Sequence, residues 1–152
     1  MQRAYLTRMP AGIPGDVSRK AEATIEAGLM AETVPFGCAV KLDANGRLAR
    51  PAASTDTVYG FMVRPYPTQD NAATADTTQD CLRRGYMTVK LARGTAARGG
   101  QVYVRVTAVS GKQVGDIEAE ADSTETRTLA VPGCLFLGAA DADGNVEISF
   151  NL

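Results

Sequence analysis

The sequence predicts an all-β protein, a small sandwich or jelly-roll-like barrel with an extended N-terminal arm. Short stretches of alternating apolar and polar residues recur along the chain, and turn residues separate them at roughly 8–12-residue intervals. No alternation of strand and helix patterns, the mark of a parallel sheet, is present. A chain of 152 residues corresponds to one compact folding unit. We divide it into an arm over residues 1–35 and a sandwich or barrel body over residues 36–152.

The arm differs from the rest of the chain in its turn residues. Two prolines and two glycines fall within residues 9–15, a density that neither a helix nor a central strand tolerates. Spaced apolar side chains run through the same region, at Tyr5, Leu6, Met9, Ile13 and Val17. We therefore expect an extended segment that lies against another surface, with one short strand near residues 24–26.

The first part of the body contains a hairpin and a buried strand. Residues 37–42 alternate and lead into Asn45-Gly46, a strong hairpin signal because both residue types accept positive φ. Residues 57–64 are apolar at successive positions, as in a strand that is buried on both faces. Residues 68–80 are polar and lack periodicity, which predicts a surface loop.

The second part of the body is predicted to be a series of strands. We expect them over residues 86–91, 101–107, 117–121, 134–138 and 146–150, with a loop over residues 92–100 and a turn over residues 141–145. In the second of these strands Val102, Val104 and Val106 point inward, because side chains alternate between the two faces of a strand. In the third, Glu118 and Glu120 are expected to point outward.

Charge and composition exclude several chemistries. The 16 Lys and Arg residues nearly balance the 17 Asp and Glu residues, which argues against binding nucleic acid by bulk phosphate neutralisation. Histidine is absent, so His-dependent nucleophile systems and imidazole zinc sites are excluded. Cys38, Cys81 and Cys134 are too far apart for a C-x-x-C pair, and we expect reduced thiols and cytoplasmic synthesis. No apolar run is long enough for a signal peptide or a membrane span.

Two acidic patterns resemble a calcium loop and a pair of catalytic carboxylates, and both have a simpler interpretation. Residues 141–145 begin like a calcium loop, but the position of the bidentate Glu would fall on Leu152, so a hairpin turn is the better interpretation. Glu118 and Glu120 lie about 7 Å apart at roughly 3.3 Å per residue, a spacing found in glycosidases. No Trp or nearby Tyr supplies a sugar platform, so a solvated strand explains them better. We expect no catalytic residue, no metal and no cofactor.

Basic residues are most concentrated around Arg83 and Arg84, with Arg93 and Arg98 in the following loop. Such a cluster fits either phosphate or acidic side chains of a protein partner. The balanced overall charge favours a protein partner, because phosphate binding normally accompanies net basicity. We therefore expect a protein interface and no nucleic acid.

Three longer segments carry a resemblance to a known family. They are residues 9–19 (MPAGIPGDVSR), 59–68 (YGFMVRPYPT) and 82–91 (LRRGYMTVKL), and residues 141–150 add to them. The chain resembles the structural cement, or capsid decoration, proteins of tailed bacteriophages. The resemblance implies a non-enzymatic virion protein on the outer surface of the icosahedral head, with two partners, itself as a dimer or trimer and the major capsid protein, whose neighbouring subunits it bridges.

Candidate contact residues follow from this implied role. We expect partner contacts at Tyr5, Arg8, Pro10, Ile13, Pro14, Arg64, Tyr66, Arg83 and Arg84. Two alternatives stay open at this point. One is a small β-barrel hydrolase that uses carboxylates converging from separate strands, and the other is a phage tail or host-surface binding module.

Overall fold

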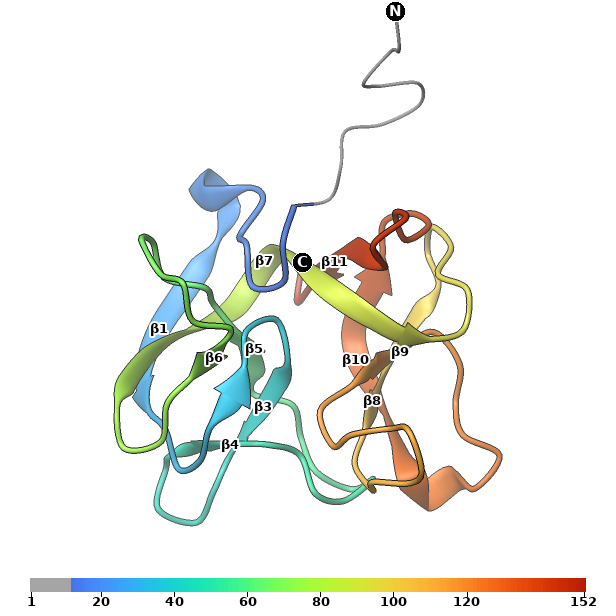
Figure 1. The fold of residues 1–152 in the computed structure, drawn as a ribbon, viewed down its shortest axis with the longest axis horizontal. Coiled ribbons are helices and arrows are strands. Elements are labelled where there is room, and N and C mark those ends of the chain that lie inside the picture. Colours follow the sequence, from blue (N-terminus) through green and yellow to red (C-terminus); the bar gives the residue numbers. More distant parts are fainter. Residues whose placement is uncertain (1–11) are drawn as a thin grey trace, which may run out of the picture.

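The structure, a computed structural model, describes residues 12–152 and is built almost entirely of β-strands (Figure 1). Its elements are η1 (Lys20–Glu22), β1 (Thr24–Leu29), β2 (Val34–Pro35), β3 (Ala39–Leu42), β4 (Leu48–Ala49), β5 (Gly60–Met62), β6 (Ala72–Ala73), β7 (Thr78–Arg93), β8 (Gln101–Arg105), β9 (Ile117–Glu118), η2 (Glu125–Arg127), β10 (Thr128–Phe136) and β11 (Asn145–Phe150). The only helical elements among the described residues are the two short 3-10 turns. The prediction of an all-β fold is confirmed.

One half of the molecule is a closed barrel. Strand β7 pairs with β11, followed by β10, β8 and β9, and β9 pairs again with β7, which closes the ring. All of these pairs are antiparallel except β7–β9, in which Leu91 lies opposite Ile117. Closure leaves no free strand edge around this ring. The predicted inward positions Val102, Val104 and Val106 are buried in its core.

The other half is a second sheet that shares β7 with the barrel. This sheet also closes, because Met30, directly after β1, forms a parallel bridge with Leu48 of β4. Its strand order is β1–β7–β5–β3–β4, and a small β2–β6 ribbon accompanies it. Figure 1 shows β7 running from this sheet into the barrel. Gly85 lies where β7 passes between them, at φ 131°, and a Cβ there would be 3.1 Å from the Cα of Ala23. The edge-on contact between Phe61 and Phe150, with ring centroids 5.2 Å apart, joins the second sheet to the barrel core.

Both predicted hairpin turns and the strand near residues 24–26 are confirmed. Asp43 Oδ1 accepts hydrogen bonds from the backbone N–H groups of Asn45 and Arg47, and Gly46 has φ 74°. Residues 141–145 form the corresponding turn before β11, where Asp141 caps the turn in the same way. These turns follow from residue types that hydrogen-bond locally, and so they were visible in the sequence.

Three strand predictions and one loop prediction need correction. Strand β5 is shorter than residues 57–64, and residues 68–80 are not one loop, because they contain β6 and the start of β7. Strand β10 begins at Thr128, well before residue 134, because Gly133 at φ 67° lets it continue past Pro132 with a shift of register. Strand β9 ends at Glu118, which lies opposite Tyr103 and so points away from the barrel core as predicted, but its side chain is buried and not solvated.

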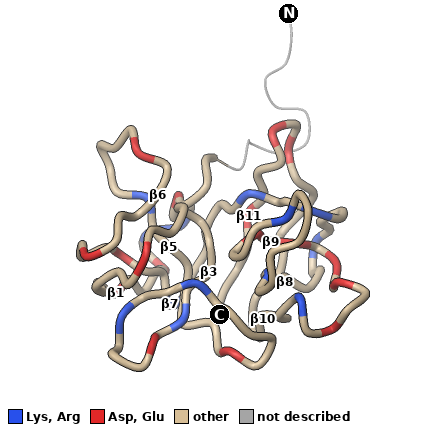
Figure 2. Tube along the Cα trace, turned by 60° about the horizontal axis from the view of Figure 1, so that its bottom comes forward, with Lys and Arg blue, Asp and Glu red and all other residues tan. Residues whose placement is uncertain are grey.

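The described part of the predicted arm lies on the body. Strand β1 pairs with β7, β2 pairs with β6, and Val17 forms an isolated bridge with Met87. Residues 1–11 lie outside the described part of the chain, and with them the predicted contacts Tyr5, Arg8 and Pro10. The division into an arm over residues 1–35 and a body over 36–152 stays a prediction. Charged residues of both signs are interspersed over both halves (Figure 2).

Candidate functional site

Residues 12–19, which we call the arm base, lie where the second sheet and the barrel diverge from β7. The backbone N–H of Gly15 donates to the carbonyl of Thr88 at 2.9 Å, and the N–H of Thr88 donates to the carbonyl of Asp16 at 2.9 Å. On the other side, the N–H of Arg64 donates to the carbonyl of Gly15 at 2.9 Å. The arm base is therefore held between β7 and the segment that follows β5.

Only glycine fits at position 15. Its φ is +92°, in the region that side chains disfavour. A Cβ atom there would lie 2.7 Å from the Cβ of Phe36 and 2.9 Å from the Cβ of Arg64. The close approach of three segments thus depends on the missing side chain, which explains one of the glycines in the predicted arm.

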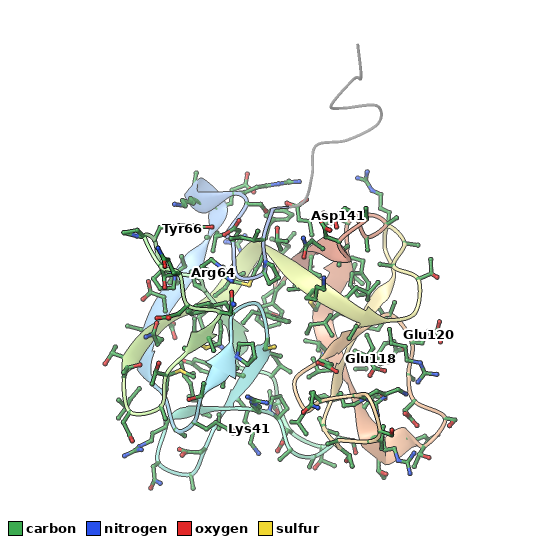
Figure 3. The ribbon with its side chains drawn as sticks, in the orientation of Figure 1. Lys41, Arg64, Tyr66, Glu118, Glu120 and Asp141 are labelled. Carbon is green, nitrogen blue, oxygen red and sulfur yellow. The ribbon has the colours of Figure 1, made fainter. Side chains whose placement is uncertain are left out.

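Arg64, Tyr66 and Pro14 come together at the arm base, as Figure 3 shows for the first two. The guanidinium of Arg64 donates to the carbonyl of Pro14 at 3.0 Å and to that of Asp70 at 2.7 Å, and it lies 5.0 Å from the centre of the Phe36 ring. Its Nε and Nη1 thus donate within the chain. Arg64 positions the arm base, and it is only half-buried.

Tyr66 presents most of its ring to solvent, with 63% of the residue exposed. Its hydroxyl donates a hydrogen bond to the carboxylate of Asp16, which raises the pKa of Tyr66. The second oxygen of Asp16 accepts the backbone N–H of Ile13 at 3.1 Å. Ile13 itself is 45% exposed, so the side chain of Ile13 and the ring of Tyr66 are both accessible to solvent next to Asp16.

A groove of about 580 Å³ opens next to the arm base. Its lining includes Asp16, Val17, Ile25, Val63, Tyr66 and Asp80. The lining combines apolar side chains with two carboxylates and with the basic residues Lys20 and Arg64, and it reaches strand β1 at Ile25. Such a surface of balanced charge suits an extended protein segment with apolar and polar side chains.

Arg83 and Arg84 do not form one patch, since neighbours on a strand point to opposite faces. The Arg83 guanidinium lies 3.4 Å from the centre of the Tyr59 ring, and its Nε is 3.3 Å from Oε2 of Glu26. The Tyr59 hydroxyl donates to the same carboxylate oxygen at 2.6 Å, which raises the pKa of Tyr59. Arg83 is thus engaged inside the chain, whereas Arg84 is exposed.

The barrel contains an ion network that the sequence patterns did not indicate. Arg105 Nε lies 2.5 Å from Glu118 Oε1, Arg105 Nη2 lies 2.9 Å from Glu118 Oε2, and both residues are fully buried. Arg105 Nη2 also contacts Asp122 at 2.9 Å. The pKa of Asp122 is held far below its usual range, mostly by a hydrogen bond from the backbone N–H of Thr124 and next by the hydrogen bond from Arg105.

This network also bears on Glu118 and Glu120, which the sequence analysis considered as a carboxylate pair and set aside. Glu118 forms a buried salt bridge with Arg105, whereas Glu120 is exposed at the outer side of the barrel (Figure 3). By strand alternation Arg105 should face solvent, because Val104 and Val106 face the core. The chain between β8 and β10 covers it instead, and no short-range pattern in the sequence shows that cover.

No group of three or more His, Cys, Asp or Glu residues among residues 12–152 is arranged to hold a metal ion. All three cysteines are unpaired, and burial raises the pKa of the Cys38 and Cys81 thiols to about 12 and that of Cys134 further still. These thiols are poor nucleophiles at neutral pH. Within the same residues, no helix has the length and apolar character needed to cross a membrane.

Comparison with known proteins identifies relatives in phage capsids. The family described as XM1 gp53 minor capsid protein matches residues 1–150. A chain of the solved structure "The capsid of Myoviridae Phage XM1" has the same fold, with a TM-score of 0.74 at 20% sequence identity. The match covers 99% of this chain and 97% of that one. No curated protein matches the chain.

Proposed function

Since the chain belongs to the XM1 gp53 minor capsid protein family, we propose that it decorates the outer surface of the icosahedral head and stabilises the head by bridging neighbouring major capsid subunits. The coarser role, a structural protein associated with a phage capsid, follows from the family match over residues 1–150. That match is the observation that carries the proposal. It agrees with a fold shared over nearly the whole length of a chain in a phage capsid structure.

The arm base supports the bridging role. Four backbone hydrogen bonds hold Gly15, Asp16 and Ser18 on β7 and the segment after β5, so a pull on the preceding residues is transmitted into both halves of the body. Residues 1–11 carry two arginines and several apolar side chains and have no acidic residue. Such a segment suits a surface with apolar depressions and carboxylates on a neighbouring subunit.

The predicted contact residues take different roles in this proposal. Tyr5, Arg8 and Pro10, with exposed Ile13 and Tyr66, contact the major capsid protein. Pro14 and Arg64 hold the arm base, and Arg83 is already paired with Glu26. Arg84 is exposed and available to a partner.

Self-association would strengthen binding to the head. Several weak contacts become one strong attachment when linked copies engage several capsid sites, because the later contacts form at a high effective concentration. We therefore propose that the protein acts as a homo-oligomer, a dimer or a trimer, made in the host cytoplasm and assembled on the head.

The test is a truncation that removes residues 1–11 and keeps the arm base. Removing residues 1–11 leaves the hydrogen bonds of Gly15 and Asp16 intact, so the protein keeps its circular dichroism spectrum and unfolding transition. Heads that lack the protein are incubated with either form, sedimented and compared by gel densitometry. We expect the truncated form to lose most of its occupancy. Occupancy equal to that of the full chain, or recovery of the full chain with tails, would contradict the proposal.

A further inference from the structure

Three basic side chains surround Asp122 on the wall of the barrel. Arg93 ends β7, Lys112 lies in the loop between β8 and β9, and Arg127 ends η2. Their side-chain nitrogen atoms lie 3.8, 3.5 and 3.9 Å from the carboxylate oxygens of Asp122. We call these three residues the outer cations. Each keeps between 27% and 43% of its side chain exposed, so together they form a basic surface above a nearly buried carboxylate.

The carboxylate of Asp122 already has its hydrogen bonds. Its Oδ1 accepts the backbone N–H of Thr124 at 3.0 Å, and its Oδ2 accepts Nη2 of Arg105 at 2.9 Å. The side chains of the outer cations donate no hydrogen bond to Asp122 or to any other residue within residues 12–152. Partly exposed ion pairs of this length contribute little to stability. The donors of the outer cations are therefore available to a partner.

Positive charge exceeds negative charge in this cluster. Arg105 and the outer cations, four cations in all, share the two carboxylates of Glu118 and Asp122. Nη1 of the fully buried Arg105 has no hydrogen-bond partner within the described part of the chain. It is bonded to the same carbon as Nη2, which contacts Asp122, so this unsatisfied donor lies next to the cluster. A buried charged donor without an acceptor is costly, and a further anion beside it lowers that cost.

The nearest acidic residues along the chain do not neutralise the outer cations. Glu120 and Glu125 are exposed, and neither forms an ion pair with a basic side chain among residues 12–152. The whole chain has a net charge of −1, which disfavours a long polyphosphate as the ligand. The planar guanidinium groups of two arginines match the paired oxygens of carboxylates. The cluster therefore suits one or a few carboxylates of another protein.

We propose that the outer cations bind the carboxylates of an acidic segment on a neighbouring capsid subunit. These carboxylates accept hydrogen bonds from Arg93, Lys112 and Arg127 and offset the excess positive charge of the cluster. The choice of a capsid subunit as the partner rests on the proposed function. The choice of carboxylates as the ligand rests on the cluster itself.

The cluster gives the protein a second contact surface, apart from the arm base. Figure 3 shows Glu118, which lies beside the outer cations, in the barrel half of the molecule. Arg64 and Tyr66, which mark the arm base, lie in the other half of the same view. A protein that bridges two subunits needs two separate surfaces. The arm base and the residues before it serve one subunit, and the outer cations serve the next.

A fluorescent peptide of six glutamates tests the site in the full chain. Fluorescence anisotropy at physiological ionic strength should show saturable binding to the wild-type chain, and a peptide of six glutamines should not bind. Arg93→Gln combined with Arg127→Gln should weaken binding about tenfold, because two charged contacts are lost. The matched control is Arg47→Gln combined with Arg98→Gln, which changes the net charge equally at surface arginines outside the cluster and should bind like the wild-type chain. Equal weakening in both double variants, or no binding by the wild-type chain, would overturn the inference.

Two further measurements separate the site from folding and from small ions. The double variant at the cluster should keep the thermal transition of the wild-type chain, because the ion pairs that it removes are weak. If it unfolds earlier, Lys112→Gln replaces it, removes only the remaining outer cation and should weaken binding about threefold. Inorganic phosphate in millimolar amounts, at constant ionic strength, should displace little of the peptide. Full displacement by phosphate, with acetate inactive, would assign the cluster to phosphate groups and overturn the inference.

Heads separate this inference from the proposed function. The double variant at the cluster should sediment with heads less than the wild-type chain and the control variant do. If the wild-type chain does not bind heads but the peptide distinguishes the two double variants, the carboxylate site stands and the decoration role fails. If heads bind the wild-type chain and the cluster variant equally, the decoration role stands and this contact fails.

Discussion

Gly15 donates its backbone N–H to the carbonyl of Thr88 at 2.9 Å, and this bond ties the arm base to the strand shared by both halves of the molecule. Thr88 lies in β7 where that strand belongs to the barrel, whereas Arg64, bound to the carbonyl of Gly15, follows β5 of the second sheet. A segment that the sequence assigns to an arm is thus also part of the packing between the two halves.

Gly15→Ala should destabilise the protein by about 3 kcal/mol, because it combines left-handed strain with a clash against Phe36 and Arg64. Urea unfolding measures the change in free energy. Gly46→Ala is the control, since its φ is +74° but nothing lies within 4 Å of the added Cβ. It should cost about 1 kcal/mol. Equal losses would show that the close approach at Gly15 is unimportant.

Glu118→Gln should cost about 3 kcal/mol, because it removes the buried carboxylate that binds both Nε and Nη2 of the Arg105 guanidinium and leaves Asp122 at Nη2. The control is Glu120→Gln, an exposed carboxylate two residues away, which should change stability by less than about 0.5 kcal/mol. Both are read from urea unfolding at neutral pH. A small effect at Glu118 would mean that water reaches Arg105.

Acid should destabilise the fold partly through Asp122. The pKa of this carboxyl is lowered in the folded state from an ordinary value of 3.8, so its contribution is fully present above that value and is lost as the pH falls below it. Unfolding free energies measured between neutral pH and about pH 2 should decline less steeply in Asp122→Asn than in the wild-type chain. Parallel curves for the two proteins would exclude Asp122 as a source of the pH dependence.

Replacement by alanine should affect stability at Arg83 and binding to heads at Arg84. Arg83→Ala removes the contacts with Tyr59 and Glu26 and should cost about 1 kcal/mol in thermal unfolding. Arg84→Ala should leave the transition unchanged and weaken sedimentation with heads, because its side chain is exposed. If Arg84→Ala binds heads like the wild-type chain, Arg84 is not a contact residue.

Local chemistry made the fold class and the turns predictable. Residue type alone indicates the turn conformations at Asp43, Gly46, Asp141 and Gly144. The alternation of valines in β8 indicates which face of that strand points inward. The strand near Thr24 was visible in the same way, although its full length to Leu29 was not.

The burial of a residue by a segment distant in sequence was not predictable from such patterns. Arg105 is buried because the chain between β8 and β10 passes over it, and Glu118 lies on the same face of the sheet and pairs with it. The arm base is likewise set by contacts of Gly15 with Phe36 and Arg64, which are distant in sequence. A single sequence gives local propensities and faces, and it does not state which distant segments meet.

Cryo-electron microscopy of the intact phage particle tests the central claim most directly. The account predicts density for this chain on the outer surface of the head, in contact with at least two major capsid subunits through residues that precede Gly12. Density on the inner surface, or copies that each rest on a single major capsid subunit, would contradict it.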